Sequence, residues 1–197
     1  MSPALPASQA DPAPLAQPLH LAFSGKTARN RFLKAAMSEH MATWDPEVRS
    51  RRGIPTTELV NLYRRWGQGG FGVILTGNVV IDYDNLETYG NPIVPLDAPF
   101  EGERFDKFRE MAAAGKAGGG LMIAQVSHPG RQVSEDINPH PIAPSDIPLD
   151  DGLMGKKWAR PKAMDEGDFK AVLDGFVHAA EFLYKAGFDG VQLHAGQ

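Results

Sequence analysis

The sequence predicts an α/β fold in which parallel strands alternate with helices. Four short apolar runs are typical of buried strands, and three amphipathic stretches separate them. The order β-α-β-α-β-α-β implies a parallel sheet with right-handed crossovers. The connections also differ in length: long loops follow the first and third strands, whereas the loops that lead into strands are short.

The chain begins with a segment rich in proline and alanine. Residues 1–16 lack the basic start and apolar stretch of a signal peptide, and five prolines lie within the first 18 residues. Such a segment buries too little apolar surface to offset the cost of ordering it. We therefore expect a disordered arm at 1–16 and a single domain over 17–197.

The first strand and helix are predicted at residues 31–37 and 55–70. The strand run is RFLKAAM, and it follows a turn-like stretch at 24–30. Thr56 or Thr57 can cap the helix, and Glu58 suits its positive N-terminal end. One face of the helix is apolar, and glycines end it. The residues of that face are Leu59, Leu62, Tyr63 and Trp66.

The second unit is predicted as a strand at 71–81 and a helix at 103–115. The strand run FGVILTGNVVI is apolar on both faces, as in a buried parallel sheet. Gly67–Gly72 spells G-x-G-x-x-G, but it follows a helix and precedes a strand, the reverse of a dinucleotide fingerprint. These glycines are therefore interpreted as a helix stop.

The third unit is predicted as a strand at 121–126, a helix at 168–187 and a fourth strand at 190–194. The helix has the clearest periodicity in the chain, with apolar residues at i, i+3 and i+4 spacing. Those residues are Phe169, Val172, Leu173, Phe176, Ala179, Ala180, Leu183 and Ala186.

Two architectures fit this order: a doubly wound open sheet and a piece of an eight-stranded βα barrel. In both, ligands bind at the carboxyl ends of the strands. The long loops at 38–54 and 127–164 lie on that side, and this asymmetry favours the partial barrel, with about the first four βα units present. The same ends carry polar groups, at Met37–Ser38, Thr76–Asn78, Gln125–His128 and His194.

Composition excludes several functions. The 197 residues are 42% hydrophobic and 22% charged, which suffices for a core, and the net charge of −4 gives no case for binding nucleic acid or an anionic membrane. The chain has no cysteine, and its six histidines form no metal-ligand pattern. No apolar run approaches the ~20 residues that span a bilayer, so we expect a cytoplasmic protein.

Two polar residues in buried strands are candidate site residues. Gln125 interrupts an apolar strand, where an amide either bonds a neighbouring backbone group or meets the edge of a heterocycle. His194 ends a strand and needs a partner or a ligand. From these residues alone, the structural and the functional interpretations are equally supported. His128 and Arg131 follow Gln125 in an ordinary turn or a site element, and no hydrolase triad or P-loop is present.

Four segments together resemble the Old Yellow Enzyme family of NADH:flavin oxidoreductases. They are NRFLKAAMS at 30–38, GVILTGN at 72–78, QVSHPGR at 125–131 and AGFDGVQLH at 186–194, in the family's order and spacing. The resemblance covers about residues 17–197. It implies a TIM barrel, FMN as cofactor and NADH or NADPH as reductant.

The resemblance also implies roles for individual residues. Ala36, Met37 and Ser38 match the segment that lies along the flavin, where Ser38 tunes its redox potential, and Asn78 matches the second-strand residue whose backbone meets the flavin. Gln125 matches the glutamine that hydrogen-bonds the pyrimidine part of the ring. His194 matches the first of two residues that bind the carbonyl oxygen of an unsaturated substrate.

The implied reaction is hydride transfer from NAD(P)H through FMN to an electron-poor alkene, with a small unsaturated carbonyl compound as substrate. Gln197 stands where the family has the second carbonyl ligand, and the later tyrosine proton donor and phosphate-binding loops are absent. We therefore expect a truncated chain that is inactive alone and associates through exposed strand edges. The alternatives are a non-enzymatic half-barrel that serves as an assembly or interaction module, and an unrelated four-strand α/β domain.

Overall fold

A computed structural model describes residues 10–150, 152 and 155–194. Residues 1–9 of the expected arm and Gln197 lie outside the described residues. The elements in chain order are α1 (Ala13–Ala16), β1 (Leu19–Leu21), β2 (Lys26–Ala28), β3 (Leu33–Lys34), η2 (Arg49–Arg51), α2 (Thr57–Gln68), β4 (Val73–Val80), α3 (Gly102–Gly115), β5 (Leu121–Ser127), β6 (Ile142–Ala143), β7 (Lys162–Ala163), α4 (Glu166–Lys185) and β8 (Gly190–His194).

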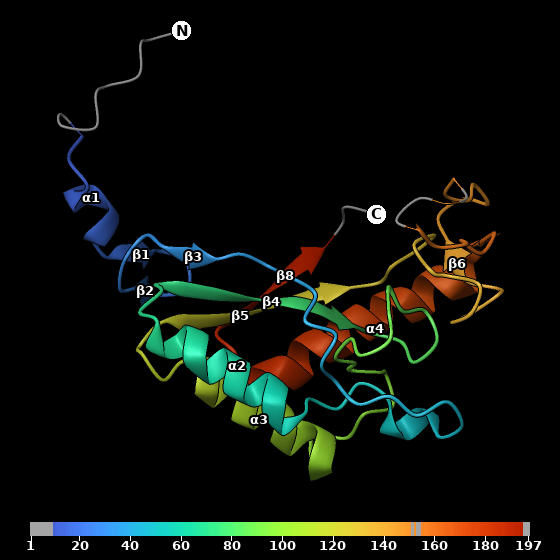
Figure 1. The fold of residues 1–197 in the computed structure, drawn as a ribbon, viewed down its shortest axis with the longest axis horizontal. Helices are drawn as coiled ribbons and strands as arrows, with labels where there is room; N and C mark the ends of the chain where they lie inside the picture. The colour runs from blue at the N-terminus through green and yellow to red at the C-terminus, as the bar shows by residue number, and fades with distance from the viewer. Residues whose placement is uncertain (1–9, 151, 153–154, 195–197) are drawn as a thin grey trace, which may run out of the picture.

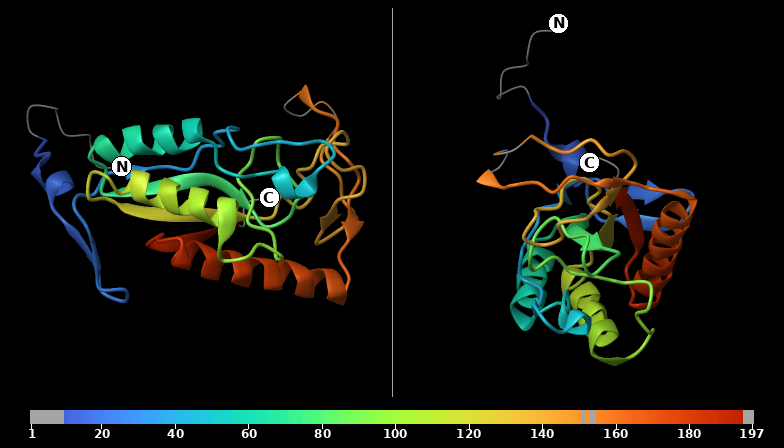
Figure 2. Two further views of the ribbon diagram at one scale, coloured as in Figure 1. Left: turned by 90° about the horizontal axis from the view of Figure 1, so that it is seen from below. Right: turned by 90° about the vertical axis from the view of Figure 1, so that its right-hand side faces the viewer.

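The central feature is a four-stranded parallel sheet in the order β3-β4-β5-β8. Its strands follow one another in space as they do in sequence, whereas a doubly wound sheet reverses its order part-way. Helices α2, α3 and α4 lie side by side on one face of this sheet (Figures 1 and 2). Sequential strands with helices on one side are the arrangement of a βα barrel segment, which agrees with the predicted fold class.

The core lies between the sheet and the three helices. Met122, Ala124 and Val126 alternate along β5 and belong to the buried cluster formed with the helices. Phe182 of α4 meets the rings of Phe105 and Phe108 of α3 edge-on, with centroids 5.2 and 5.6 Å apart. This packing fixes the helical layer and leaves the opposite face of the sheet for polar groups.

The helix ends follow from local chemistry. The Thr56 hydroxyl accepts a hydrogen bond from the backbone N–H of Leu59 at 3.2 Å, and Gly69 is the C-cap of α2. At α4, Asp165 and Asp168 form a reciprocal capping box. The expected helix stop at the glycines after α2 is therefore confirmed.

The first strand is shorter than expected. Only Leu33 and Lys34 pair with β4, whereas the prediction was residues 31–37. Beyond them β4 contains an irregularity between Leu75 and Asn78, and the backbone N–H of Gly77 bonds the Glu39 carboxylate at 3.0 Å in place of a strand carbonyl. Met37 therefore does not end a strand, and its carbonyl oxygen lies close to Gly77 of β4.

Only part of the apolar stripe predicted for α4 is buried. Ala179 and Leu183 are buried as predicted, but the side chains of Phe169 and Leu173 are exposed. The other described residues therefore cover only part of the predicted apolar stripe. None of the described helices is long and apolar enough to span a membrane.

Two small sheets and a short helix were not predicted. β1 and β2 form an antiparallel hairpin ahead of the main sheet, and β6 pairs with β7 inside the long loop after β5. Residues 13–16 form one helical turn without a buried side chain. The disorder of the arm as a whole stays a prediction.

Candidate functional site

Strand register brings several polar side chains to one face of the sheet. Asn78 pairs with Gln125, and Gln125 pairs with Gln192. Paired residues of neighbouring parallel strands point to the same side, so these three amides form a row across the sheet. The row lies on the face opposite the helices, because Ala124 and Val126, the neighbours of Gln125, belong to the core.

A second row lies one step nearer the strand ends. Ser127 pairs with His194, two residues beyond the pair of Gln125 and Gln192. The predicted residues Gln125 and His194 therefore share one face of the sheet. We call the two rows, made of Asn78, Gln125, Gln192, Ser127 and His194, the polar rim.

The polar rim holds both satisfied and unsatisfied groups. The Gln125 amide donates to the Gln192 side-chain oxygen at 2.7 Å, and Gln125 is 8% exposed. The Asn78 amide donates to Glu87 at 3.0 Å. In contrast, Asn78 Oδ1 and Ser127 Oγ are buried without a hydrogen-bond partner among the described residues. Unpaired buried polar atoms are costly, so these two are available for a ligand.

The segment that contains Ala36, Met37 and Ser38 comes close to β4 at Gly77 and is linked to the polar rim. A Cβ placed on Gly77 would lie 2.2 Å from the Met37 carbonyl oxygen, which shows how closely the two backbones approach. Met37 is 53% exposed. The Ser38 hydroxyl donates to Glu87 at 2.9 Å, so Glu87 joins this segment to Asn78.

Sequence reasoning missed Gln192 and Glu87. Gln192 carried a usable signal, because it is a polar residue inside a strand, like Gln125. Glu87 carried none: it lies in the loop that follows β4, to which no role was assigned, and only the fold brings it to Ser38 and Asn78.

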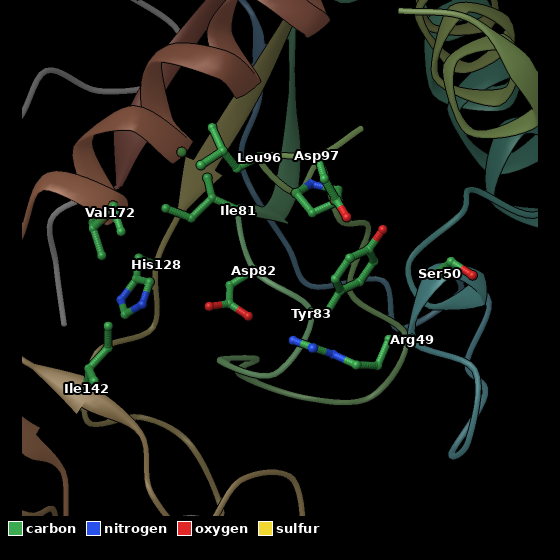
Figure 3. Close-up of a pocket in the computed structure, with 13 residues that line it drawn as sticks. Arg49, Ser50, Ile81, Asp82, Tyr83, Leu96, Asp97, His128, Ile142 and Val172 are labelled. Carbon is green, nitrogen blue, oxygen red and sulfur yellow. The ribbon is translucent and has the colours of Figure 1, made fainter. Parts of the chain in front are cut away.

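A separate cavity of about 580 Å³ lies between the loops after β3, β4 and β5 and the first half of α4 (Figure 3). Of the candidate site residues singled out from the sequence, only His128 lines it. Its lining residues include Arg49, Asp82, Tyr83, His128 and Val172. The cavity is on the helical side of the sheet and is distinct from the polar rim.

His128 is a partly buried titratable group of this cavity. Its Nδ1 accepts a hydrogen bond from the backbone N–H of Gly130 at 3.2 Å, and its Nε2 is buried without a partner among the described residues. Burial lowers the pKa of His128, and the nearby Asp82 carboxylate opposes that shift in part. The neutral ring with its proton on Nε2 fits both observations.

Comparison with known proteins shows the family and the fold of the chain. A model of the NADH:flavin oxidoreductase / NADH oxidase family matches residues 14–197. An NADH-dependent flavin oxidoreductase of Aspergillus parasiticus, nadA, is 54% identical over 185 residues, which cover 94% of this chain and 42% of that protein. The iliE flavin oxidoreductase of Hypocrea jecorina is 30% identical over 87% of this chain and 44% of its own length.

Solved structures show the same fold. The old yellow enzyme of Trypanosoma cruzi superposes with a TM-score of 0.74 at 22% identity, over 92% of this chain and 51% of that one. The homologue from Zymomonas mobilis gives 0.72 at 26% identity, over 92% and 48%. The chain thus spans less than half of these two curated relatives and about half of the solved structures.

Proposed function

The chain belongs to the NADH:flavin oxidoreductase / NADH oxidase family, and we propose that it forms one side of the FMN site in an enzyme that reduces electron-poor alkenes. The family's cofactor is FMN, with NAD(P)H as reductant. The observation that carries the proposal is the row of Asn78, Gln125 and Gln192, whose amides line one face at the strand ends.

The residues of the polar rim fit a flavin. The pyrimidine edge of the ring presents donors and acceptors side by side, and an amide side chain offers both. Gln125 is already oriented by Gln192, while Asn78 Oδ1 and Ser127 Oγ lack partners within the described chain. These are the groups that would hold the polar edge of the ring. Ala36 and Met37 would lie along the ring, with Ser38 near its reactive edge.

Bound FMN would supply the redox chemistry, namely hydride transfer from NAD(P)H to the carbon β to an electron-withdrawing group. The role of the chain is to orient the alkene and to stabilise the charge that develops on its carbonyl oxygen. His194 is the residue for this role, because it lies on the rim face one step beyond Gln192. A donor aimed at a developing oxyanion is worth about 10²–10³ in rate.

A second candidate function is an assembly module without catalysis. It is favoured by the exposed apolar side chains of α4 and β8, among which Leu173 is 63% and Leu193 65% exposed.

We propose that the chain alone neither holds FMN firmly nor turns over, because it presents one side of the site.

An FMN titration followed by quenching of flavin fluorescence tests the proposed function. It compares the chain with a completed barrel, a chimaera that joins residues 14–194 to the C-terminal part of the Aspergillus parasiticus relative. We expect tight binding and NAD(P)H-dependent reduction of cyclohexenone by the completed barrel alone. A completed barrel that folds but binds no FMN would refute the proposed flavin site. Tight binding of FMN by the chain alone would refute the proposal that the chain presents only one side of that site.

His194→Ala in the completed barrel tests the substrate role. We expect unchanged FMN binding and unchanged reduction by NAD(P)H, but a reaction with the enone that is slower by about 10²-fold or more. Stopped-flow absorbance separates the two half-reactions. Equal losses in both would make His194 a structural residue.

A further inference from the structure

A buried charged cluster lies beneath β4, apart from the polar rim. Lys34, Glu39 and Tyr63 meet there, and the side chains of Lys34 and Glu39 are only 4% and 2% exposed. Their charged atoms are 3.8 Å apart. The Lys34 ammonium also lies over the Trp66 ring, 4.0 Å from its centroid. Buried charges are costly unless they are paired and hydrogen-bonded. The hydrogen-bond partners of these charges therefore indicate the structural role of the cluster.

The partners are backbone groups of β4. The Gly77 N–H donates to the Glu39 carboxylate at 3.0 Å, and the Lys34 ammonium donates to the Leu75 carbonyl at 2.9 Å. The Tyr63 hydroxyl donates to Glu39 and accepts a second hydrogen bond from the Gly77 N–H at 3.2 Å. Burial, together with the neighbouring carboxylate, raises the pKa of Tyr63 well above its ordinary value, so the phenol keeps its proton.

These contacts converge where β4 carries an extra residue. Leu75 pairs with Ile123 and Asn78 with Gln125, so three steps along β4 match two along β5. A bulge of this kind flips every later side chain to the other face. Without it, Asn78 would pair with Val126 and point toward the helices. The bulge is therefore what places Asn78 in the polar rim.

We propose that Glu39 is a positioning residue for the polar rim: its carboxylate holds the β4 bulge through Gly77, with Lys34 and Tyr63 as its support. The proposal deepens the proposed function and rests on it in taking the rim as the flavin side. A purely stabilising role does not explain the arrangement. Apolar residues could fill the space, but they would leave the Gly77 N–H and the Leu75 carbonyl without partners.

Amide-resolved hydrogen exchange of the chain tests the hold on the bulge without any flavin. The Gly77 amide is compared with that of Ala124, which serves as an internal reference in β5. In Glu39→Ala we expect Gly77 to exchange about ten- to a hundredfold faster relative to Ala124. Glu39→Gln keeps an acceptor for the Gly77 N–H and should restore protection to within about threefold of wild type.

The control is Met111→Ala, which destabilises the buried core of α3 and leaves the side chains that bond the Gly77 N–H in place. It should speed exchange at Gly77 and Ala124 alike. Unchanged Gly77 protection in Glu39→Ala, or an equal loss at both amides, would overturn the positioning role. If Gly77 is unprotected in the wild-type chain, the same comparison is made in the completed barrel.

FMN affinity of the completed barrel gives the functional measurement. We expect Glu39→Ala to weaken binding at least about tenfold, Glu39→Gln by less than about threefold, and Met111→Ala not at all. Unchanged affinity in Glu39→Ala despite a loosened Gly77 would overturn the link to the rim. A wild-type completed barrel without FMN affinity would instead refute the proposed function, and the exchange result would still decide whether Glu39 holds the bulge.

Discussion

Gln125 follows four apolar residues in β5, and the two neighbouring strands decide how its amide is used. It pairs with Asn78 on one side and with Gln192 on the other, and its side chain bonds the latter at 2.7 Å. An amide fixed by another amide keeps a defined orientation, because both groups carry donors and acceptors. At the scale of single residues, the polar rim is thus preorganised.

Replacing Gln125 by leucine removes this orientation and a ring partner together. In the completed barrel we expect Gln125→Leu to weaken FMN binding by about 1–3 kcal/mol, since buried polar groups lose a hydrogen-bond partner. Gln68→Leu is the matched control, because Gln68 is exposed at the C-terminal end of α2, away from the rim. A fluorescence titration measures both, and an unchanged dissociation constant in Gln125→Leu would remove this residue from the site.

The lowered pKa of His128 makes the free energy of unfolding depend on pH. Its pKa is lowered by burial in the folded state, whereas the unfolded chain has the ordinary value of about 6.5. Between the two values the unfolded state binds more protons, so the free energy of unfolding falls as the pH falls from about 6.5 toward the lowered pKa. At higher pH this loss is absent.

Urea denaturation at about pH 7.5 and about pH 5.5 measures the effect, which lies on the acid side of the ordinary pKa. The wild-type chain should lose more stability between the two conditions than His128→Gln, because other titrating groups are common to both. An equal loss in the two proteins would show that His128 titrates normally.

At the scale of elements, β4 is defined by its bulge and by the close approach of the segment around Met37. Gly77 allows that approach, since a Cβ would meet the Met37 carbonyl oxygen at 2.2 Å and the Glu39 carboxylate at 2.5 Å. A backbone atom at such a distance cannot give way without moving the segment.

We therefore expect Gly77→Ala to lower the free energy of unfolding by about 1–3 kcal/mol. Gly167→Ala serves as control, because Gly167 lies in the first turn of α4 and its Cβ would meet only the Asp165 side chain, at 3.2 Å. Alanine in a helix should be neutral or stabilising by about 0.5–1 kcal/mol. Denaturant titrations that rank the two variants equally would contradict the close approach seen at Gly77.

At the scale of the whole molecule, the sheet is covered on one side and ends in open edges. No strand among the described residues pairs with the outer edge of β8, and Leu193 on that strand is 65% exposed. Phe169, Leu173, Val177 and Tyr184 form an exposed apolar row on α4. Free strand edges and apolar patches of this kind promote association.

The wild-type chain should therefore associate with increasing concentration in size-exclusion chromatography. Leu193→Lys places a charge on the edge strand and should shift the protein toward monomer. Ile147→Lys makes the same exchange at an exposed loop position and should leave the elution unchanged. A wild-type chain that stays monomeric at every concentration would contradict this view of the edges.

Local patterns predicted most of the framework. The helix limits fell within two residues of those observed, because caps, glycine stops and apolar periodicity act within a few residues of chain. The length of β3 was wrong and the apolar stripe of α4 was too broad, because pairing and cover depend on distant segments. The roles of Ala36, Met37, Ser38, Asn78, Gln125 and His194 remain predictions.

The sequence by itself determined the βα alternation, the parallel sheet and the polar residues at the strand ends, since each depends on neighbours along the chain. Only the tertiary structure decided that all three large helices cover one face, that Glu87 joins Ser38 to Asn78, and that Glu39 holds Gly77. The bulge in β4 shows the reason. Its register depends on side chains of β3, α2 and the connecting segment, and no local pattern encodes a contact between residues 38 positions apart.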